Sequence, residues 1–282
     1  MEILSSIGAM QAWRRSVPLG TRIGFTPTMG NLHAGHISLV EKARSYADVV
    51  VASIFVNPMQ FGDSEDLDTY PRTLAADLSK QSDTGVTAVF TPTVNDIYPH
   101  VVDNHTIVEV PGLTDVLCGA SRASHFRGVT TVVHKLFGAV LPDVAVFGEK
   151  DLQQVLVIKK MVSDLLMSTE VVTVPTMRES DGLAMSSRNR YLTDSERKLA
   201  PRFSSALIDC VHAIQSGASA IEDSVKATYR ELAKAGFTID YLEARRTFDL
   251  MPAISLRDEI AVFGAVKLGQ TRLIDNRVIT PA

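Results

Sequence analysis

The sequence predicts an α/β protein, with a doubly wound, Rossmann-like parallel sheet followed by a second, smaller α+β domain. Short apolar runs alternate with helical patterns through about the first 175 residues, and this alternation is typical of a parallel sheet covered by helices. Unusual polar loops follow three of the apolar runs, at the strand ends where such sheets bind ligands. After Pro175 the alternation stops. We therefore expect a first domain over residues 1–176 and a C-terminal domain over residues 177–282.

The strands expected in the first domain are short apolar runs rich in β-branched residues. Residues 48–56 (DVVVASIFV) are apolar on both faces, as a buried parallel strand should be. Residues 125–141 instead carry apolar side chains at helical spacing. The expected strands are 22–26, 48–56, 88–90, 106–110, 143–147 and 171–174, and the expected helices are 36–47, 74–81, 125–141 and 151–165.

The second domain begins with longer helical patterns. Thr193 and Glu196 have the spacing of a capping box, which predicts a long helix over 193–215. A second helix is expected over 221–235, ended by Gly236. Short strands are expected over 239–244, 259–266 and 270–275.

Composition excludes several classes of protein. A chain of 282 residues with 45% hydrophobic content buries a sizeable core. A net charge of -4 and scattered Lys and Arg argue against a nucleic-acid partner. No apolar stretch approaches the roughly 18 residues that span a bilayer, and the N-terminus lacks a signal-peptide pattern. Two distant cysteines match no metal-binding spacing. We expect a soluble, cytoplasmic protein that does not bind a membrane.

The most informative motif is His33-Ala34-Gly35-His36, which follows the glycine turn at Gly30 and opens a helical pattern. Two imidazoles three residues apart lie on one face of a helix. The first turn of a helix attracts phosphate through its free N–H groups and dipole. Imidazole N–H groups can also follow charge that builds on a phosphate in the transition state. The alternative is that one histidine is a helix cap and the other a surface residue.

Three further loops carry polar side chains suited to small polar substrates. Gln60 follows a predicted strand and offers both a donor and an acceptor, although it is equally compatible with an ordinary loop residue. Arg122 can bind an anion through two N–H groups or lie exposed to solvent. Gln153 and Gln154 point in different directions, so only one of them can face the site, and we choose Gln154, partly because of the family resemblance described below.

Two segments have features expected of phosphate binding. Lys150 lies early in a predicted helix, where a cation opposes the helix dipole unless it neutralises a phosphate. Ser186-Ser187-Arg188 combines two hydroxyls with a guanidinium in a loop that can close over a nucleotide, although it also fits a polar linker. The sequence has no P-loop and no evident Ser-His-Asp or Cys-His arrangement.

Six blocks resemble the pantothenate synthetase (pantoate–β-alanine ligase) family, in family order from Pro27 to Asn189. The blocks are PTMGNLHAGH, SIFVNPMQF, YPRT, HFRGVTTVVHKLF, FGEKDLQQ and DGLAMSSRN. That family is similar to class I aminoacyl-tRNA synthetases and nucleotidyltransferases. His33–His36 resembles their HIGH signature, and 186–188 resembles their mobile KMSKS loop. The last third matches only by its length and by a Leu-Ile-Asp-Asn ending at 273–276.

The resemblance implies a two-step reaction. The pantoate carboxylate attacks the α-phosphorus of ATP to give pantoyl adenylate and pyrophosphate, and the β-alanine amine then displaces AMP. A carboxylate is ionised at neutral pH, so the first step needs no protein base. Positioning and charge stabilisation should dominate catalysis. The resemblance also implies Mg²⁺ as a cofactor and a homodimer.

The resemblance assigns roles to individual residues. His36, usually labelled the proton donor, is catalytic together with His33 and Lys150. Gln60, Gln154 and Arg122 bind substrate, Tyr70 lies around the same pocket, and Asp77 helps to place Mg²⁺. Three positions depart from the family pattern, namely Asn31, Ala123-Ser124 and Gly138. The ATP-binding set is Met29, Gly30, Asn31, Leu32, His33, Ala34, Gly35, His36, Gly148, Glu149, Lys150, Asp151, Met177, Met185, Ser186, Ser187 and Arg188.

Two rival functions belong to other classes. A nucleotidyltransferase that releases an adenylated or cytidylated product would make pyrophosphate but never AMP. A nucleotide sensor or an RNA-binding module would catalyse nothing. The acidic sequence pI of about 6.0 argues against RNA, and the His, Lys and Arg set argues against an inactive sensor.

Overall fold

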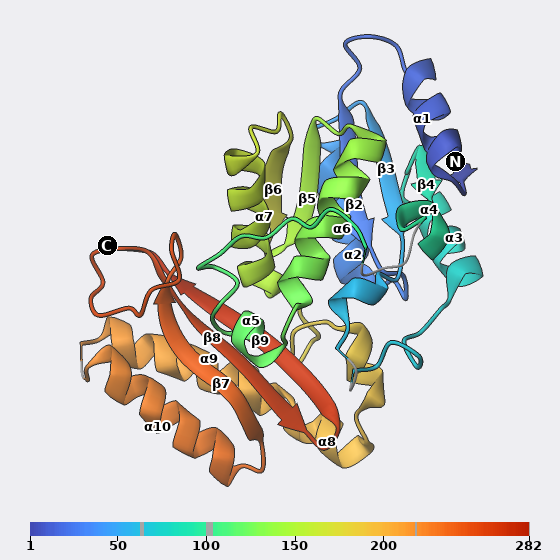
Figure 1. Ribbon diagram of the computed structural model, residues 1–282. Coiled ribbons are helices and arrows are strands. Elements are labelled where there is room, and N and C mark those ends of the chain that lie inside the picture. The colour runs from blue at the N-terminus through green and yellow to red at the C-terminus, as the bar shows by residue number, and fades with distance from the viewer. Residues whose placement is uncertain (63–64, 100–103, 218, 282) are drawn as a thin grey trace. The chain divides into compact units, whose positions relative to one another are not determined.

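The computed structural model describes residues 1–62, 65–99, 104–217 and 219–281. The chain forms two compact units (Figure 1). The N-terminal unit comprises Met1–Thr114, Arg122–Glu149 and Gln153–Pro175. The C-terminal unit comprises Asp115–Ser121, Lys150–Leu152 and Thr176–Ala282.

The N-terminal unit is built on a six-stranded parallel sheet in the order β1-β4-β3-β2-β5-β6. The chain turns back across the sheet between β2 and β5, and doubly wound sheets bind ligands beside such a switch point. The predicted fold class is confirmed. The strands are β1 (Glu2–Leu4), β2 (Ile23–Thr28), β3 (Val49–Ile54), β4 (Ala88–Phe90), β5 (Val144–Gly148) and β6 (Glu170–Val174).

Helices cover both faces of this sheet. Because parallel crossovers are right-handed, connections that run in opposite directions across the sheet lie on opposite faces. Helix α2 therefore covers one face, and α6, which lies in front of the sheet in Figure 1, covers the other. The helices from α1 to α7, without α5, are α1 (Ile7–Ser16), α2 (Ala34–Arg44), α3 (Leu74–Ser82), α4 (Val94–Ile97), α6 (His125–Val140) and α7 (Leu152–Asp164).

The core of this unit follows from the β-branched strands and the apolar helix faces. Val50, Val51 and Ala52 of β3 are at most 1% exposed. On the α6 face, the Phe137 ring packs between the rings of Phe25 and Phe147, with centroid distances of 6.1 and 6.5 Å. Buried aromatic pairs of this kind stabilise a core beyond the area they bury.

One predicted strand is wrong, because residues 106–110 have no regular secondary structure. The Val108 N–H donates to Thr131 Oγ1 at 3.1 Å, and the Val108 carbonyl accepts from Thr130 Oγ1 at 2.5 Å. Side chains of α6 therefore pair the backbone groups that a neighbouring strand would otherwise pair. Strand β1 and helix α1 precede every element predicted from the sequence.

The C-terminal unit contains a three-stranded antiparallel sheet, with two of its helices packed on a shared apolar core. The strands are β7 (Thr238–Arg246), β8 (Ile260–Leu268) and β9 (Thr271–Ile279). The helices are α5 (Cys118–Ser121), α8 (Asp194–Leu199), α9 (Pro201–Gln215) and α10 (Ile221–Lys234). Phe203 of α9, Leu232 of α10 and Val262 of β8 are at most 1% exposed in the core between them.

The long helix predicted over 193–215 is interrupted. The expected capping box forms, since the Thr193 N–H donates to Glu196 Oε2 and the Glu196 N–H to Thr193 Oγ1. Helix α8 nevertheless ends at Leu199, and α9 begins at Pro201. Proline lacks an N–H and favours the first position of a new helix.

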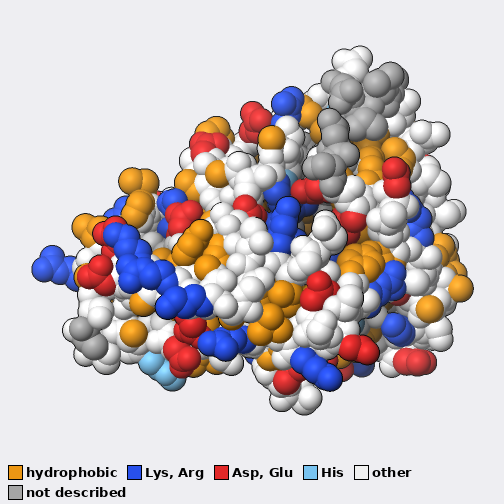
Figure 2. All heavy atoms as spheres, turned by 90° about the horizontal axis from the view of Figure 1, so that it is seen from below, with side chains coloured by type: hydrophobic (Ala, Val, Ile, Leu, Met, Phe, Trp, Pro, Cys, Tyr) orange, Lys and Arg blue, Asp and Glu red, His pale blue; other side chains and the backbone are white. Residues whose placement is uncertain are grey.

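Positive and negative side chains are interspersed on the molecular face drawn in Figure 2. This distribution agrees with the scattered charges of the sequence. Among the described residues, the helices are too short or too polar to cross a bilayer.

Candidate active site

The loop between β2 and α2 has a backbone that only a few residue types tolerate. Gly30 (φ 83°) and Asn31 (φ 51°) both adopt the left-handed conformation, which glycine and asparagine accept most readily. A Cβ at Gly30 would lie 3.0 Å from Asp77 Oδ2 and 3.1 Å from Ile54. The loop therefore passes close to α3 and to β3, and the glycine permits that approach.

Asp77 of α3 holds this loop through hydrogen bonds to its backbone. Its carboxylate is 1% exposed and accepts from the N–H groups of Asn31 and Leu32, each at 2.8 Å, and from Thr73 Oγ1 at 2.9 Å. Lys80 Nζ adds a 2.6 Å bond to the Leu32 carbonyl. The Asp77 oxygens thus face the loop backbone rather than an open cation site. Elsewhere in the described chain no group of three or more His, Cys, Asp or Glu residues is arranged to hold a metal ion.

His33 and His36 form a capping box at the start of α2. The Gly35 N–H donates to His33 Nδ1, and the His33 N–H donates to His36 Nδ1, each at 3.2 Å. The ring centroids are 4.1 Å apart. A neutral imidazole that accepts at Nδ1 carries its proton on Nε2. The cap therefore sets both rings to donate from Nε2.

Gln60 lies at the end of a short 3₁₀ turn, η1 (Pro58–Gln60), which follows β3. Asn57, 1% exposed, donates from Nδ2 to Gln60 Oε1 at 3.1 Å. Tyr98 Oη in turn donates to Asn57 Oδ1 at 2.8 Å, and burial raises the Tyr98 pKa, which keeps the phenol protonated. Gln60 Nε2 approaches Met29 Sδ at 3.0 Å. The Gln60 amide is therefore oriented by its neighbours.

Helix α6 packs directly against the backbone of η1. A Cβ at Gly128 would lie 2.3 Å from the Met59 carbonyl oxygen and 2.6 Å from the Gln60 nitrogen. The Gly128 carbonyl also accepts from Asn57 Nδ2 at 3.0 Å. Any larger residue at this position would displace the turn that carries Gln60.

Arg122 is engaged by a carboxylate within the N-terminal unit. Its Nε and Nη2 atoms bind the two Glu65 oxygens at 2.6 Å each. Burial raises the Glu65 pKa, but hydrogen bonding and the charge of Arg122 outweigh it and hold that pKa below its usual value. Arg122 Nη1 lies 2.9 Å from His125 Nε2, and His125 Nδ1 lies 2.8 Å from the Gln60 carbonyl. Arg122 is thus connected to the backbone of Gln60.

The two neighbouring glutamines of α7 differ in their surroundings. Gln153 is 5% exposed and donates from Nε2 to the Leu113 carbonyl at 2.9 Å, whereas Gln154 is half-buried. At the end of β5, Glu149 accepts from Thr173 Oγ1 at 2.7 Å. The Gln153 amide is therefore engaged by the backbone, and the substrate-binding role of Gln154 stays a prediction.

In the C-terminal unit, residues 177–185 form a hairpin. The Met185 N–H donates to the Met177 carbonyl and the Glu179 N–H to the Leu183 carbonyl, while Gly182 (φ 88°) takes the tight turn. The chain then enters a 3₁₀ helix, η3 (Ser187–Tyr191), capped by Ser186 Oγ, which accepts from the Arg188 N–H at 3.3 Å. Met177 is 40% exposed.

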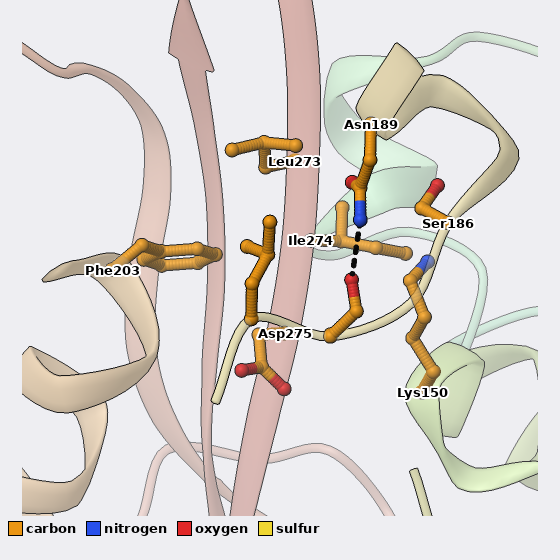
Figure 3. A pocket seen from close by; sticks show the side chains of 9 residues that line it. Lys150, Ser186, Asn189, Phe203, Leu273, Ile274 and Asp275 are labelled. Carbon is orange, nitrogen blue, oxygen red and sulfur yellow. Dashed lines mark hydrogen bonds between the residues drawn. The ribbon is translucent and has the colours of Figure 1, made fainter. Parts of the chain in front are cut away.

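Lys150 and Ser186 line one pocket of the C-terminal unit (Figure 3). Lys150 belongs to a third short turn, η2 (Glu149–Asp151). The dashed line in Figure 3 marks the bond from Asn189 Nδ2 to the Ala184 carbonyl, at 3.0 Å, which holds η3 to the hairpin. The pocket is lined by Lys150, Leu183, Ala184, Ser186, Asn189, Phe203, Leu273, Ile274 and Asp275.

Comparison with known proteins places this arrangement in a family. The family model described as pantoate-beta-alanine ligase matches residues 2–278. The chain belongs to the pantoate–β-alanine ligase family. The pantothenate synthetase of Stutzerimonas stutzeri is 50% identical over 280 residues, which are 99% of this chain and 98% of that protein. The pantothenate synthetase of Shewanella amazonensis is 53% identical over 271 residues, 96% of this chain and 95% of that protein.

Solved structures agree with the family assignment. The enzyme from Thermus thermophilus has a TM-score of 0.93 and 41% identity, and all of both chains is covered. The pantoate–β-alanine ligase from Francisella tularensis, complexed with β,γ-ATP and β-alanine, has a TM-score of 0.83 and 35% identity, again over all of both chains. As a member of the pantoate–β-alanine ligase family, this chain is a pantothenate-forming ligase.

The site residues expected for a pantoate–β-alanine ligase form two groups. In the N-terminal unit, direct contacts connect Met29, Gln60 and Arg122, and the β2–α2 loop carries His33 and His36. In the C-terminal unit, Lys150 and Ser186 line one pocket. Sequence reasoning missed five residues that hold these groups, namely Asn57, Glu65, Tyr98, Asp275 and Asn276. Asn57 carried a signal, since it directly follows a predicted strand, and Asp275 and Asn276 belong to the Leu-Ile-Asp-Asn ending that resembles the family.

Proposed function

We propose that this ligase condenses pantoate with β-alanine through a pantoyl adenylate, consuming ATP and releasing AMP and pyrophosphate. The observation that carries the proposal is the imidazole capping box at the start of α2. The F. tularensis relative, which is complexed with β,γ-ATP and β-alanine, supports the choice of ligands. ATP also fits a helix start at the switch point of a doubly wound sheet.

His33 and His36 would act on the phosphate that undergoes substitution. With both Nδ1 atoms accepting from the backbone, each neutral ring carries its proton on Nε2, which would donate to the phosphate. Donors aimed at a phosphate stabilise the charge that develops there. The pantoate carboxylate is already ionised, so no protein base is required for its attack.

Gln60 and Gln154 would bind pantoate, with Gln60 also near β-alanine. Asn57 holds the Gln60 amide in one orientation, which fits a group that must recognise a small polar acid. Arg122 was expected from the sequence to bind substrate. In the structure its charge is balanced by Glu65, and its Nη2 donates to the Gln60 carbonyl. We infer that Arg122 acts by positioning Gln60.

For the C-terminal unit we propose phosphate binding by Lys150, Ser186, Ser187 and Arg188. Residues 1–176 would then serve as the nucleotide- and pantoate-binding domain and residues 177–282 as the lid domain. We propose Mg²⁺ as the ion that accompanies ATP. The described residues include no group of three or more His, Cys, Asp or Glu arranged to hold a metal ion, and Asp77 accepts from backbone N–H groups. The placing of Mg²⁺ by Asp77 therefore stays a prediction. The resemblance also supports a cytoplasmic location and a homodimer. Sedimentation of the purified protein tests the oligomeric state.

The decisive experiment compares His36→Ala with the wild type. We expect turnover to fall by about 10²-fold or more, because a donor to the developing phosphate charge is lost. AMP and pyrophosphate are measured with and without pantoate and β-alanine. His212→Ala, in α9, is the matched control and should retain activity. Wild-type turnover by His36→Ala would contradict the proposed role, and pyrophosphate release without AMP would identify a nucleotidyltransferase instead.

A further inference from the structure

Two consecutive buried residues of β9 contact both parts of the C-terminal unit to which phosphate binding is assigned. Asp275 is 3% exposed and Asn276 is 7% exposed. Asp275 binds Arg178 through both oxygens, at 2.8 and 2.9 Å. Asn276 donates from Nδ2 to the Lys150 carbonyl at 3.1 Å. One strand therefore contacts Lys150 directly and the 177–185 hairpin through Arg178.

Arg178 extends the contact from β9 to the far end of the hairpin. Its Nη1 donates to the Gly182 carbonyl at 3.1 Å and to Ser204 Oγ of α9 at 3.0 Å. The hairpin is also held by Leu183 and Ala184, which are 2% and 4% exposed. These contacts fix the position of the hairpin and therefore where the following residues, 186–188, begin.

Asp275 supplies the negative charge in a region with two guanidinium groups. Arg277 Nη2 donates to Ser204 Oγ at 2.9 Å, the same hydroxyl that Arg178 contacts. Burial and the charge of Arg178 lower the Arg277 pKa, and the Asp275 charge offsets part of that effect. Without the carboxylate, the two cations would repel each other, and Arg178 would lose its bidentate partner.

We propose that Asp275 and Asn276 are positioning residues for adenylate formation, Asn276 fixing the Lys150 backbone and Asp275 fixing the hairpin that leads to Ser186–Arg188. The inference rests on the phosphate-binding role proposed for those residues. Asp275 lines the same pocket as Lys150 and Ser186 (Figure 3). A buried ion pair contributes little stability relative to apolar side chains of similar volume, so a geometric role explains its presence better.

The part of the proposal that concerns Asn276, here called the Asn276 arm, is tested by a double-mutant cycle that combines Asn276→Ala with Lys150→Ala. The readout is pantoate-dependent exchange of pyrophosphate into ATP, which reports adenylate formation alone. Asn276→Ala should slow exchange about tenfold to a hundredfold, as expected when a reacting group is misplaced. In the Lys150→Ala background it should have little further effect, because the ammonium group that it positions is absent although the carbonyl that it contacts remains. Fully additive losses would overturn the inference.

The Asp275 arm is tested in the same way, with Asp275→Asn and Arg188→Ala. We again expect non-additive losses in exchange, together with a raised KM for ATP. Circular dichroism and urea unfolding establish that each variant is folded. The Asn276 cycle stands by itself if Asp275→Asn fails to fold.

Thr228→Val is the matched control for a purely structural effect. Thr228 is a buried hydroxyl of α10, 6% exposed, which donates to the Ser224 carbonyl. It should lower stability and leave exchange unchanged. Should it slow exchange as much as Asn276→Ala, the effect is general destabilisation and the inference is wrong. Absence of exchange in the wild type would refute the proposed adenylate. A normal rate in Lys150→Ala would refute the Lys150 role, and the Asn276 arm with it.

Discussion

Replacing Asp77 by asparagine tests whether this residue holds the histidine loop. The carboxylate accepts from two backbone N–H groups and one hydroxyl while 1% exposed. In Asp77→Asn, one oxygen becomes an NH₂ group, which faces at least one of these donors. A buried N–H left unsatisfied costs about 1–3 kcal/mol, and the remaining bonds lose about 1 kcal/mol because they are no longer to a charged group. We expect the free energy of unfolding to fall by about 2–4 kcal/mol.

Urea unfolding measures this loss directly, and steady-state kinetics report the accompanying fall in kcat as the loop moves. Asp83→Asn is the matched control, since Asp83 lies exposed at the end of the same helix and should change stability by less than about 0.5 kcal/mol. A loss in Asp77→Asn no larger than in this control would refute the reasoning. Wild-type stability with activity restored by excess Mg²⁺ would support a metal-binding role instead.

Two further predictions follow from contacts around Gln60. Gly128→Ala should cost about 1–3 kcal/mol by overpacking and should raise the KM for pantoate. Gly138→Ala, on the same helix with nothing within 4 Å of its Cβ, should cost nothing, and equal urea midpoints for the two variants would contradict the prediction. For Glu65 the pKa lies below its usual 4.5, so its stabilising effect is present above that value and is lost as pH falls through the lowered pKa. The difference in unfolding free energy between the wild type and Glu65→Gln should therefore shrink in acid. Urea titrations at stepped pH measure this difference. A difference that does not change with pH would mean that the ion pair contributes nothing.

Most of the fold was predictable because burial leaves a local pattern. The apolar run that became β3 is buried on both faces, and few structures other than a parallel strand accept such a run. The break in the predicted helix at 193–215 was also readable, since Pro201 marks a helix start. Residues 106–110 were different. The backbone N–H and carbonyl of Val108 pair with the side chains of Thr131 and Thr130, and no local pattern reveals partners so distant along the chain.

In the candidate site, too, the features with a local sequence pattern were predictable and those that depend on distant residues were not. The His33–His36 spacing and the preceding glycine turn are local, so the sequence indicates them directly. The partners that hold the site are remote, as with Asp77, which is 46 residues from Asn31, and Asn276, which is 126 residues from Lys150. The sequence did not predict that both histidines cap the helix, because the cap depends on the orientation of the two rings and spacing alone does not determine it.

If the proposed role of His33 and His36 is correct, the helix cap and the reaction use different atoms of the same two rings. In most helices a serine, threonine or acidic residue begins the first turn and has no other duty. Here Nδ1 accepts from the helix backbone, and in the proposed mechanism Nε2 donates to the phosphate. An amide side chain at either position offers an oxygen for the turn but no outward ring proton. A residue at 33 or 36 must therefore meet two requirements, a cap for the helix and a donor for the phosphate. A replacement that meets only the first is expected to fold well and to fail in catalysis.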